Sequence, residues 1–181
     1  MEEIFTTFTD FTLAMMKMAF ERGIRCEGVW IFSDLCYSGG MLFSPQFYRG
    51  YLMKHLKRYA EFAHERGMDF LFHCDGDVRA FIPLLIETGI DCIHPLEARQ
   101  GNDVRELKRT YRDKIAFIGN INVDVLSRSK EEIEPEVISK IEGAKEGGGY
   151  IFHSDHSIPP MISFANYSYA VELARRHGCY D

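Results

Sequence analysis

Short apolar runs alternate with longer amphipathic segments from residue 28 onward, and this alternation constrains the fold more than any other feature of the sequence. The apolar runs fall at 28–33, 68–73, 91–94, 115–119 and 149–152. Helical periodicity predicts helices at 45–66, 78–88, 104–111, 130–146 and 164–177, and another at 4–22 ahead of the first run. Strands that alternate with helices in this way are typical of an α/β protein with a parallel sheet covered on both faces.

Punctuation at the ends of these segments supports the predicted helices. Ser44 and Pro45 place a capping hydroxyl before a proline at the first helical position. Gly67 and Gly89 follow their helices as stops, and Asp103 can cap the helix after it. Strand and helix boundaries are therefore expected close to the ranges above.

The number of strand–helix units limits the architecture. No linker or change in composition divides the sequence, so residues 1–181 are expected to form a single domain. Five units after a leading helix are too few for an eight-unit barrel, although the polar strand ends resemble those of a barrel. Two possibilities stay open: a smaller open α/β sheet, or the C-terminal part of a (βα)8 (TIM) barrel whose first units are missing or supplied by another chain.

Composition restricts the classes of partner. The net charge is −6, with 21 Lys and Arg dispersed among 27 Asp and Glu, which argues against a nucleic-acid surface and favours small molecules or proteins. Five cysteines without a CxxC pair make a disulfide framework improbable and fit a reducing cytoplasm. The acidic start and the absence of a long apolar run predict neither an export signal nor a membrane span.

Two of the apolar runs end in clusters of potential metal ligands or proton carriers. The run 70–72 leads into His73, Cys74, Asp75, Gly76 and Asp77, and the run 150–152 leads into His153, Ser154, Asp155 and His156. The carboxyl ends of parallel strands are where α/β proteins build active sites, because the strand is rigid and the following loop can be polar. The two junctions therefore predict one site.

Alternation along the first junction divides its residues by role. His73 and Asp75 point to the same side of an extended chain, and Cys74 points to the other side, where a packing role is expected. Asp77 is expected to cap the helix starting at residue 78. With one histidine of the second junction, His73 and Asp75 would form a set of two imidazoles and one carboxylate, which suits zinc or ferrous iron.

Further candidates lie at the ends of the first and fourth runs. Ser33 and Asp34 follow the first run, and Asp34 could carry a proton or bind substrate. Asn120 and Asn122 follow the fourth run, where amide side chains can line a pocket or close a turn. The sequence contains no GxxxxGK[ST], GxSxG or HExxH motif, so common phosphate, nucleophile and metalloprotease signatures are excluded.

Taken together, these segments resemble the uroporphyrinogen decarboxylase superfamily, which includes zinc-dependent cobalamin–coenzyme M methyltransferases. The likeness rests on five segments in order: 32–34 with 44–47, 67–77, 89–91, 118–121, and 148–160 with Asn166 and 178–180. The superfamily is a (βα)8 barrel of more than about 300 residues. The resemblance covers about units four to eight, and the N-terminal part that holds the decarboxylase's arginine-rich segment and catalytic aspartate has no counterpart here.

The resemblance implies a set of site residues. The methyltransferase branch binds zinc through an HxC pair and a later cysteine. His73 and Asp75 match the pair, with Asp75 at the cysteine position, and His156 falls at the later cysteine. His156 also falls on the histidine of a glycine-flanked decarboxylase motif. Because true decarboxylases generally lack the HxC-type pair, His73 and Asp75 favour the methyltransferase-like branch.

The expected protein is thus a metal-dependent methyltransferase-like member of this superfamily, with zinc or another divalent metal such as iron, and with a corrinoid as a candidate methyl carrier. The expected residues by role are metal ligands His73, Asp75 and His156; catalytic residues His156, Asp34 and Asp155; and substrate-binding residues Ser33, Asn120, Asn122 and His153. Two alternatives stay open, a decarboxylase-like carboxy-lyase and a non-catalytic or incomplete barrel. The incomplete barrel predicts a homo-oligomer or a partner chain that supplies the missing units.

Overall fold

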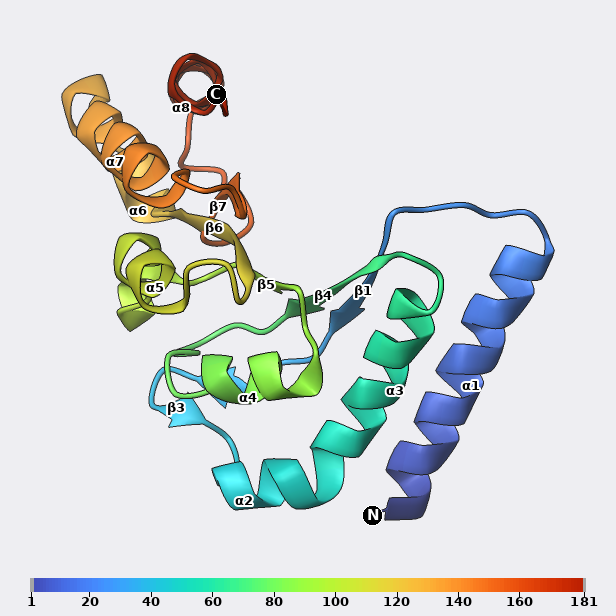
Figure 1. Cartoon of the computed structure of the whole chain (residues 1–181). Helices are drawn as coiled ribbons and strands as arrows, with labels where there is room; N and C mark the ends of the chain where they lie inside the picture. Colours follow the sequence, from blue (N-terminus) through green and yellow to red (C-terminus); the bar gives the residue numbers. More distant parts are fainter. Residues whose placement is uncertain (1, 181) are drawn as a thin grey trace.

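Five parallel strands form one sheet in the computed structural model, which describes residues 2–180 (Figure 1). The strands are β1 (Gly28–Phe32), β4 (Asp69–His73), β5 (Cys92–His94), β6 (Ala116–Ile121) and β7 (Tyr150–Ser154), and they lie in that order. Every neighbouring pair is parallel. All five predicted strands are therefore confirmed, with ends shifted by one or two residues.

Helices connect the strands and lie along one side of the sheet. They are α1 (Glu2–Glu21), α3 (Met53–His64), α4 (Ile82–Thr88), α5 (Val104–Tyr111), α7 (Lys130–Ala144) and α8 (Phe164–His177). The predicted helix at 45–66 is a continuous run in which α2 (Pro45–Phe47) and a π-helical turn, Tyr48–Leu52, lead into α3. Short helical segments also occur at α6 (Val123–Leu126) and Ala98–Gln100. The alternation of strands and helices confirms the α/β class and the arrangement of a partial TIM barrel.

Two local predictions need correction. The helix expected from residue 78 begins at Ile82, and Asp77 instead closes a turn by accepting the backbone N–H of Arg79 at 3.1 Å and pairing with its guanidinium at 2.7 Å. The segment after β1 also forms an unpredicted antiparallel ribbon, β2 (Cys36–Tyr37) with β3 (Gly40–Met41). Two-residue strands are too short to show a periodicity in sequence.

The hydrophobic core lies between the sheet and the helices. On β4, Phe70 and Phe72 are fully buried on the helix side, while Leu71 and His73 face the other way and are half-buried. Phe81 meets Phe72 with ring centroids 6.2 Å apart. An apolar side chain contributes about 1.5–3 kcal/mol when it is fully buried, so this layer supplies much of the favourable free energy of folding.

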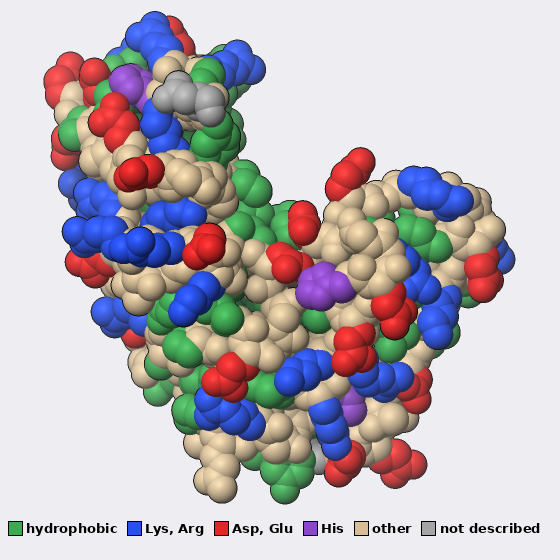
Figure 2. Space-filling model, viewed as in Figure 1, with side chains coloured by type: hydrophobic (Ala, Val, Ile, Leu, Met, Phe, Trp, Pro, Cys, Tyr) green, Lys and Arg blue, Asp and Glu red, His purple; other side chains and the backbone are tan. Residues whose placement is uncertain are grey.

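The opposite face of the sheet is open, which corrects the expectation of strands covered on both faces. Trp30 and Phe32 on β1 are 42% and 64% exposed, and Ile151 on β7 is 51% exposed. In Figure 2 the surface is hollowed between the α1 and α3 side and the α7 and α8 side, and hydrophobic side chains lie in that hollow. A closed eight-stranded barrel fills this space with its own side chains. Five strands leave it uncovered.

Among residues 2–180, the helices are all too short or too polar to span a bilayer.

Gly119 in β6 should be intolerant of a side chain. Its φ is +125°, and a Cβ built there would overlap the carbonyl oxygen of Pro95, which accepts the Asn120 N–H at 3.1 Å. We expect Gly119→Ala to lower the free energy of unfolding by more than about 2 kcal/mol, measured by urea denaturation. Gly50→Ala is the matched control, because a Cβ there meets nothing within 4 Å in a helical segment. Equal effects of the two substitutions would contradict this prediction.

Candidate functional site

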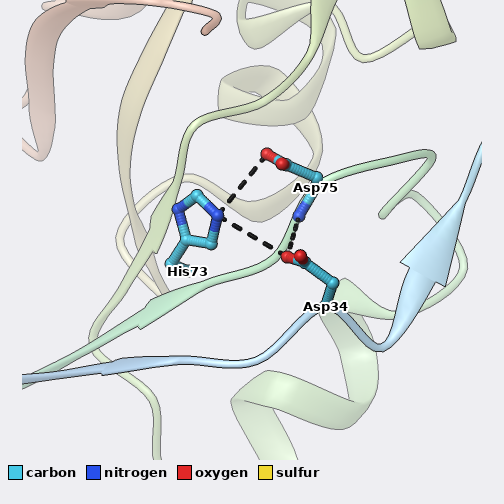
Figure 3. A group of neighbouring side chains, drawn as sticks. All are labelled: Asp34, His73 and Asp75. Atoms are coloured by element: carbon cyan, nitrogen blue, oxygen red, sulfur yellow. Dashed lines mark hydrogen bonds and ion pairs between the residues drawn. The ribbon is translucent and has the colours of Figure 1, made fainter. Parts of the chain in front are cut away.

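Three side chains at the carboxyl ends of β1 and β4 converge on one point (Figure 3). His73 Nε2 lies 3.5 Å from Asp34 Oδ1 and 3.5 Å from Asp75 Oδ1. The backbone N–H of Asp75 also donates to Asp34 Oδ1 at 3.2 Å. One ligand atom from each residue lies within 4.8 Å of the others, which defines a potential metal site.

Parallel pairing of β1 with β4 brings these residues together. Phe32 is in register with His73, and the Ser33 N–H donates to the His73 carbonyl at 3.1 Å beyond the last paired residue. This bond carries the pairing forward, so that Asp34 leaves the sheet beside Asp75. Phe32 also stacks on the His73 imidazole with ring centroids 4.6 Å apart. The three side chains thus rest on rigid strand ends.

Cys74 points away from this group, as the alternation predicts. It is 1% exposed, and its sulfur accepts the N–H of Leu35 at 3.3 Å. The neighbouring thiol of Cys36 has a raised pKa, because it hydrogen-bonds with Cys74 and is buried. Both sulfurs therefore belong to the packing under the β2–β3 ribbon, and the candidate ligands are nitrogen and oxygen.

One oxygen of Asp75 has no hydrogen-bond partner among the described residues. Asp75 Oδ1 is buried, and its contact with His73 Nε2 at 3.5 Å is too long for a hydrogen bond. A buried carboxylate oxygen without a partner costs about 1–3 kcal/mol or more, so such atoms call for an explanation. A cation bound between Asp75 and His73 would remove this cost.

A row of imidazoles continues from His73 across the open face. His73 Nδ1 lies 2.8 Å from His94 Nδ1, and the rings of His94 and His153 have centroids 4.8 Å apart. Trp30 meets His94 edge-on with centroids 5.0 Å apart. Burial, followed by the charges of His153 and His73, lowers the pKa of His94 to about 3. His94 is therefore a neutral imidazole at ordinary pH.

His94 is the site residue that the sequence reasoning missed. His94 is the last residue of the run 91–94, as His73 is of the run 68–73, and His153 directly follows the run 149–152. A histidine at the end of a predicted strand was therefore the feature that could have identified it. The three histidines share one face because the register pairs His73 with His94, and each lies at the carboxyl end of its strand.

The second predicted junction divides into buried and exposed residues. Asp155 is fully buried and accepts the N–H groups of Ala98 and Val123, both at 3.0 Å, while burial raises the pKa of its carboxyl. His153 is exposed and its Nδ1 lies 2.7 Å from the Ser154 carbonyl oxygen. Asp155 thus ties together the loops that follow β5, β6 and β7.

The described structure does not bring His156 into the group with His73 and Asp75. His156 is exposed in the loop after β7, and the group of neighbouring ligand atoms contains Asp34 in its place. Asp34 reaches the group because the register of β1 with β4 places the end of β1 beside the end of β4. Spacing along the sequence does not reveal this lateral pairing.

The predicted substrate-binding residues also differ in their surroundings. Asn120 is fully buried, and its amide accepts from the Val104 N–H at 3.0 Å and donates to the Leu96 carbonyl at 2.8 Å. Asn122 caps α6 by accepting the Asp124 N–H at 2.9 Å. Both amides are engaged within the protein, whereas His153 is exposed beside His94 on the open face, and Ser33 is half-buried at the end of β1.

The fold and the site together define part of a (βα)-barrel protein whose polar groups gather at the carboxyl ends of its strands. The family model described as "Uroporphyrinogen decarboxylase (URO-D)" matches residues 1–177. The chain therefore belongs to the uroporphyrinogen decarboxylase family.

Curated relatives match shorter segments. A protein named uroporphyrinogen decarboxylase from Pectobacterium carotovorum is 31% identical over 96 residues, which are 53% of this chain and 26% of the relative. One of the same name from Photorhabdus laumondii is 31% identical over 78 residues, 43% of this chain and 21% of the relative. The matched segments thus span about a quarter of these proteins.

A solved structure supports the fold. A methyltransferase from Methanosarcina mazei superimposes with a TM-score of 0.66 and 18% identity. The match covers 87% of this chain and 43% of that chain. This similarity confirms the barrel-type architecture, and it shows that the chain corresponds to less than half of that protein.

The neutral state of His94 should appear in the pH dependence of stability. Unfolded, the imidazole binds a proton near its ordinary pKa of about 6.5; folded, it does so only near 3. The neutral His94 imidazole therefore contributes fully to the free energy of unfolding above pH 6.5, and this contribution is lost as the pH falls from 6.5 toward 3. We expect metal-free His94→Gln to lose less stability than the wild type between pH 7 and pH 4, in urea titrations with chelator present. Parallel curves for wild type and His94→Gln would contradict the prediction.

Proposed function

We propose that this chain carries the metal-binding half of a methyltransferase-like member of the uroporphyrinogen decarboxylase family, with His73, Asp75 and Asp34 as ligands of a divalent metal. The observation that carries the proposal is the buried, unpartnered Asp75 Oδ1 beside His73 Nε2. The histidine at position 73 also matches the HxC pair of the methyltransferase branch, with Asp75 at the cysteine position.

The spacing of the three residues fits a metal ion. Two ligand atoms about 2.1 Å from one tetrahedral ion lie about 3.4 Å apart. The two contacts of His73 Nε2, with Asp34 Oδ1 and Asp75 Oδ1, are both 3.5 Å. One imidazole and two carboxylates are a harder set than thiolates, so the site is suited to zinc or ferrous iron and selects less strongly for zinc.

His94 supports this arrangement from behind His73. Ligating histidines generally donate their other ring N–H to a fixed acceptor, which sets the tautomer and the ring orientation. The neutral His94 can accept the His73 Nδ1–H at 2.8 Å, which leaves Nε2 directed at Asp34 and Asp75. Phe32 stacks on the same imidazole and limits its rotation.

The chemistry assigned to the site is methyl transfer involving a thiol or an alcohol. A divalent metal held there would lower the pKa of such a group, so that its anion could accept a methyl group from a carrier, or could leave as the anion when the methylated group gives its methyl to the carrier. His73 and the two aspartates hold the ion, and Trp30 with Phe32 supplies an apolar wall beside it. We assign substrate contacts to Ser33 and His153 and proton transfer to His156 in the loop after β7. A corrinoid is the methyl carrier that the resemblance suggests.

The setting proposed for this activity is the cytoplasm. All five cysteines, Cys26, Cys36, Cys74, Cys92 and Cys179, lie in the described part of the chain and are free thiols. Free thiols are typical of proteins in reducing compartments.

Metal analysis tests the proposal directly. We expect purified protein supplied with zinc or ferrous iron to bind about one ion per chain, and His73→Ala to weaken binding by more than about 100-fold. Affinity is measured by competition with a chelator, and thermal unfolding in excess chelator verifies that each variant folds. His64→Ala should bind as the wild type does, because His64 pairs with Asp91 away from the site. A folded wild type that binds no ion would refute the proposal.

A matched pair of substitutions identifies the third ligand. Asp34→Asn removes a charge without changing the shape of the side chain and should weaken binding about 10- to 100-fold. His156→Ala should leave affinity unchanged. If His156→Ala weakened binding and Asp34→Asn did not, the third ligand would be His156 and not Asp34.

A decarboxylase-like activity is the second candidate, favoured by the curated relatives, which carry the name uroporphyrinogen decarboxylase. It differs in its dependence on metal. Carbon dioxide release from a carboxylated porphyrinogen that persists in excess chelator and in His73→Ala would favour the decarboxylase over the methyltransferase.

A further inference from the structure

The peptide group that follows Asp75 is held on both sides by the loop after β5. The N–H of Gly76 donates to Glu97 Oε2 at 2.9 Å, and the carbonyl of Gly76 accepts from Asn102 Nδ2 at 2.8 Å. Glu97 and Asn102 lie between β5 and α5, 21 and 26 positions further along the chain. The two hydrogen bonds therefore fix the backbone next to the residue from which the Asp75 side chain extends.

Asn102 makes three hydrogen bonds to backbone groups around this peptide. It is 2% exposed, its Nδ2 also donates to the Glu97 carbonyl at 2.9 Å, and its Oδ1 accepts the Val78 N–H at 3.2 Å. Two carbonyls thus face the amide nitrogen and one N–H faces the amide oxygen, so only one orientation of the amide satisfies all three partners. Asn102 therefore ties the segment 76–78 firmly to the loop after β5.

Gly76 lies against β2 on its other side. Its φ is +90°, and a Cβ built there would lie 2.6 Å from the backbone nitrogen of Tyr37. The N–H of Asp77 donates to the Tyr37 carbonyl at 2.9 Å. The loop that carries Asp75 is therefore enclosed between β2 and the loop after β5.

The charges at the candidate site explain why this loop must be held. Asp34, His73 and Asp75 each offer a ligand atom within 4.8 Å of the others (Figure 3). Two ionised carboxylates at this separation repel each other, and among residues 2–180 neither aspartate pairs with a Lys or an Arg. A free loop would relieve this repulsion by turning Asp75 outward. The hydrogen bonds from Glu97 and Asn102 oppose that movement.

We propose that Glu97 and Asn102 are positioning residues, which keep Asp75 Oδ1 directed at His73 Nε2 whether or not a cation is bound. The inference rests on the ligand set of the proposed function, and it adds two residues outside that set. A preorganised site binds more tightly, because the loop does not have to be ordered when the ion arrives. Outer partners of metal ligands change affinity about 10- to 100-fold when they are removed.

Two substitutions of Glu97 separate its hydrogen bond from its charge. Glu97→Gln keeps an oxygen that can accept the Gly76 N–H, whereas Glu97→Ala removes that oxygen. We expect Glu97→Ala to weaken zinc binding at least about tenfold. Glu97→Gln should retain most of the wild-type affinity, because it restores the hydrogen bond without the charge. Affinity is measured with zinc alone, by competition with a chelator.

A second readout needs no metal. In metal-free Glu97→Ala we expect hydrogen exchange at the Gly76 amide to be at least about tenfold faster than in the wild type, with exchange in β6 unchanged. The NMR signals of the His73 imidazole should shift in the same variant, because Asp75 moves away from the ring. Glu97→Gln should match the wild type in both respects. A general loss of stability would instead speed exchange in the strands as well.

Asn102→Ala should have the same effects on zinc affinity and on the His73 signals. Asn166→Ala is the matched control, because Asn166 also donates to two backbone carbonyls, those of Leu126 at 2.9 Å and Arg128 at 2.8 Å. It should change neither readout. Urea denaturation verifies that each variant folds, and the Glu97 variants decide the question if Asn102→Ala does not fold.

Two results would overturn the proposal. Unchanged zinc affinity and unchanged His73 signals in Glu97→Ala would show that Asp75 keeps its place without the Glu97 contact. Equal weakening by Glu97→Gln and Glu97→Ala would show that the charge of Glu97 acts, and not its hydrogen bond. A wild type that binds no zinc would refute the ligand set of the proposed function instead. The exchange rates and His73 signals of the metal-free variants would then decide whether Glu97 positions Asp75.

Discussion

The parallel pairing of β1 with β4 is the contact on which the candidate site depends. It sets Phe32 beside His73, and the Ser33 N–H extends it by one further hydrogen bond. Without that register Asp34 would not meet Asp75, because the two residues are 41 positions apart in the chain. The site is therefore a property of two strand ends, and each strand is held by the core on the helix side of the sheet.

The two faces of the sheet have different roles. The helix face is closed by fully buried aromatic residues such as Phe70, Phe72 and Phe81. The other face presents His73, His94 and His153 together with exposed apolar side chains. The first face accounts for folding, and the second holds the chemistry and remains open. In a complete barrel the second face would be the interior, where imidazoles are shielded from water.

Much of the fold could be predicted from the sequence, because each strand is a short apolar run bounded by clear signals. The five strands and the helices at 104–111 and 164–177 follow from periodicity and capping alone. The ribbon at 36–41 could not be predicted, since two-residue strands have no periodicity. The open face was missed for a different reason. Apolar residues destined for the inside of a barrel have the same pattern whether or not the remaining strands are present.

The site was predicted in part. His73 and Asp75 were found because alternation along one strand places both on one side. Asp34 and His94 both join them through the lateral pairing of neighbouring strands, a relation that is not visible along a single segment. Asn120 was predicted to bind substrate, but its side chain is buried and hydrogen-bonds to backbone groups of neighbouring loops. The sequence does not show whether a polar residue at a strand end faces a pocket or such backbone groups.

The carboxylate of Asp155 has a consequence for how the rim of the sheet can change. It joins the loops after β5, β6 and β7 through two backbone N–H groups, so a shift in one of these loops disturbs the other two. The segment that carries Asp34 is tied instead to the loop after β4, through the Asp75 N–H that Asp34 accepts and the Leu35 N–H that Cys74 accepts. The rim thus consists of two linked groups of loops, and a change in the loop after β1 would act first on the loop after β4 and so on the position of Asp75.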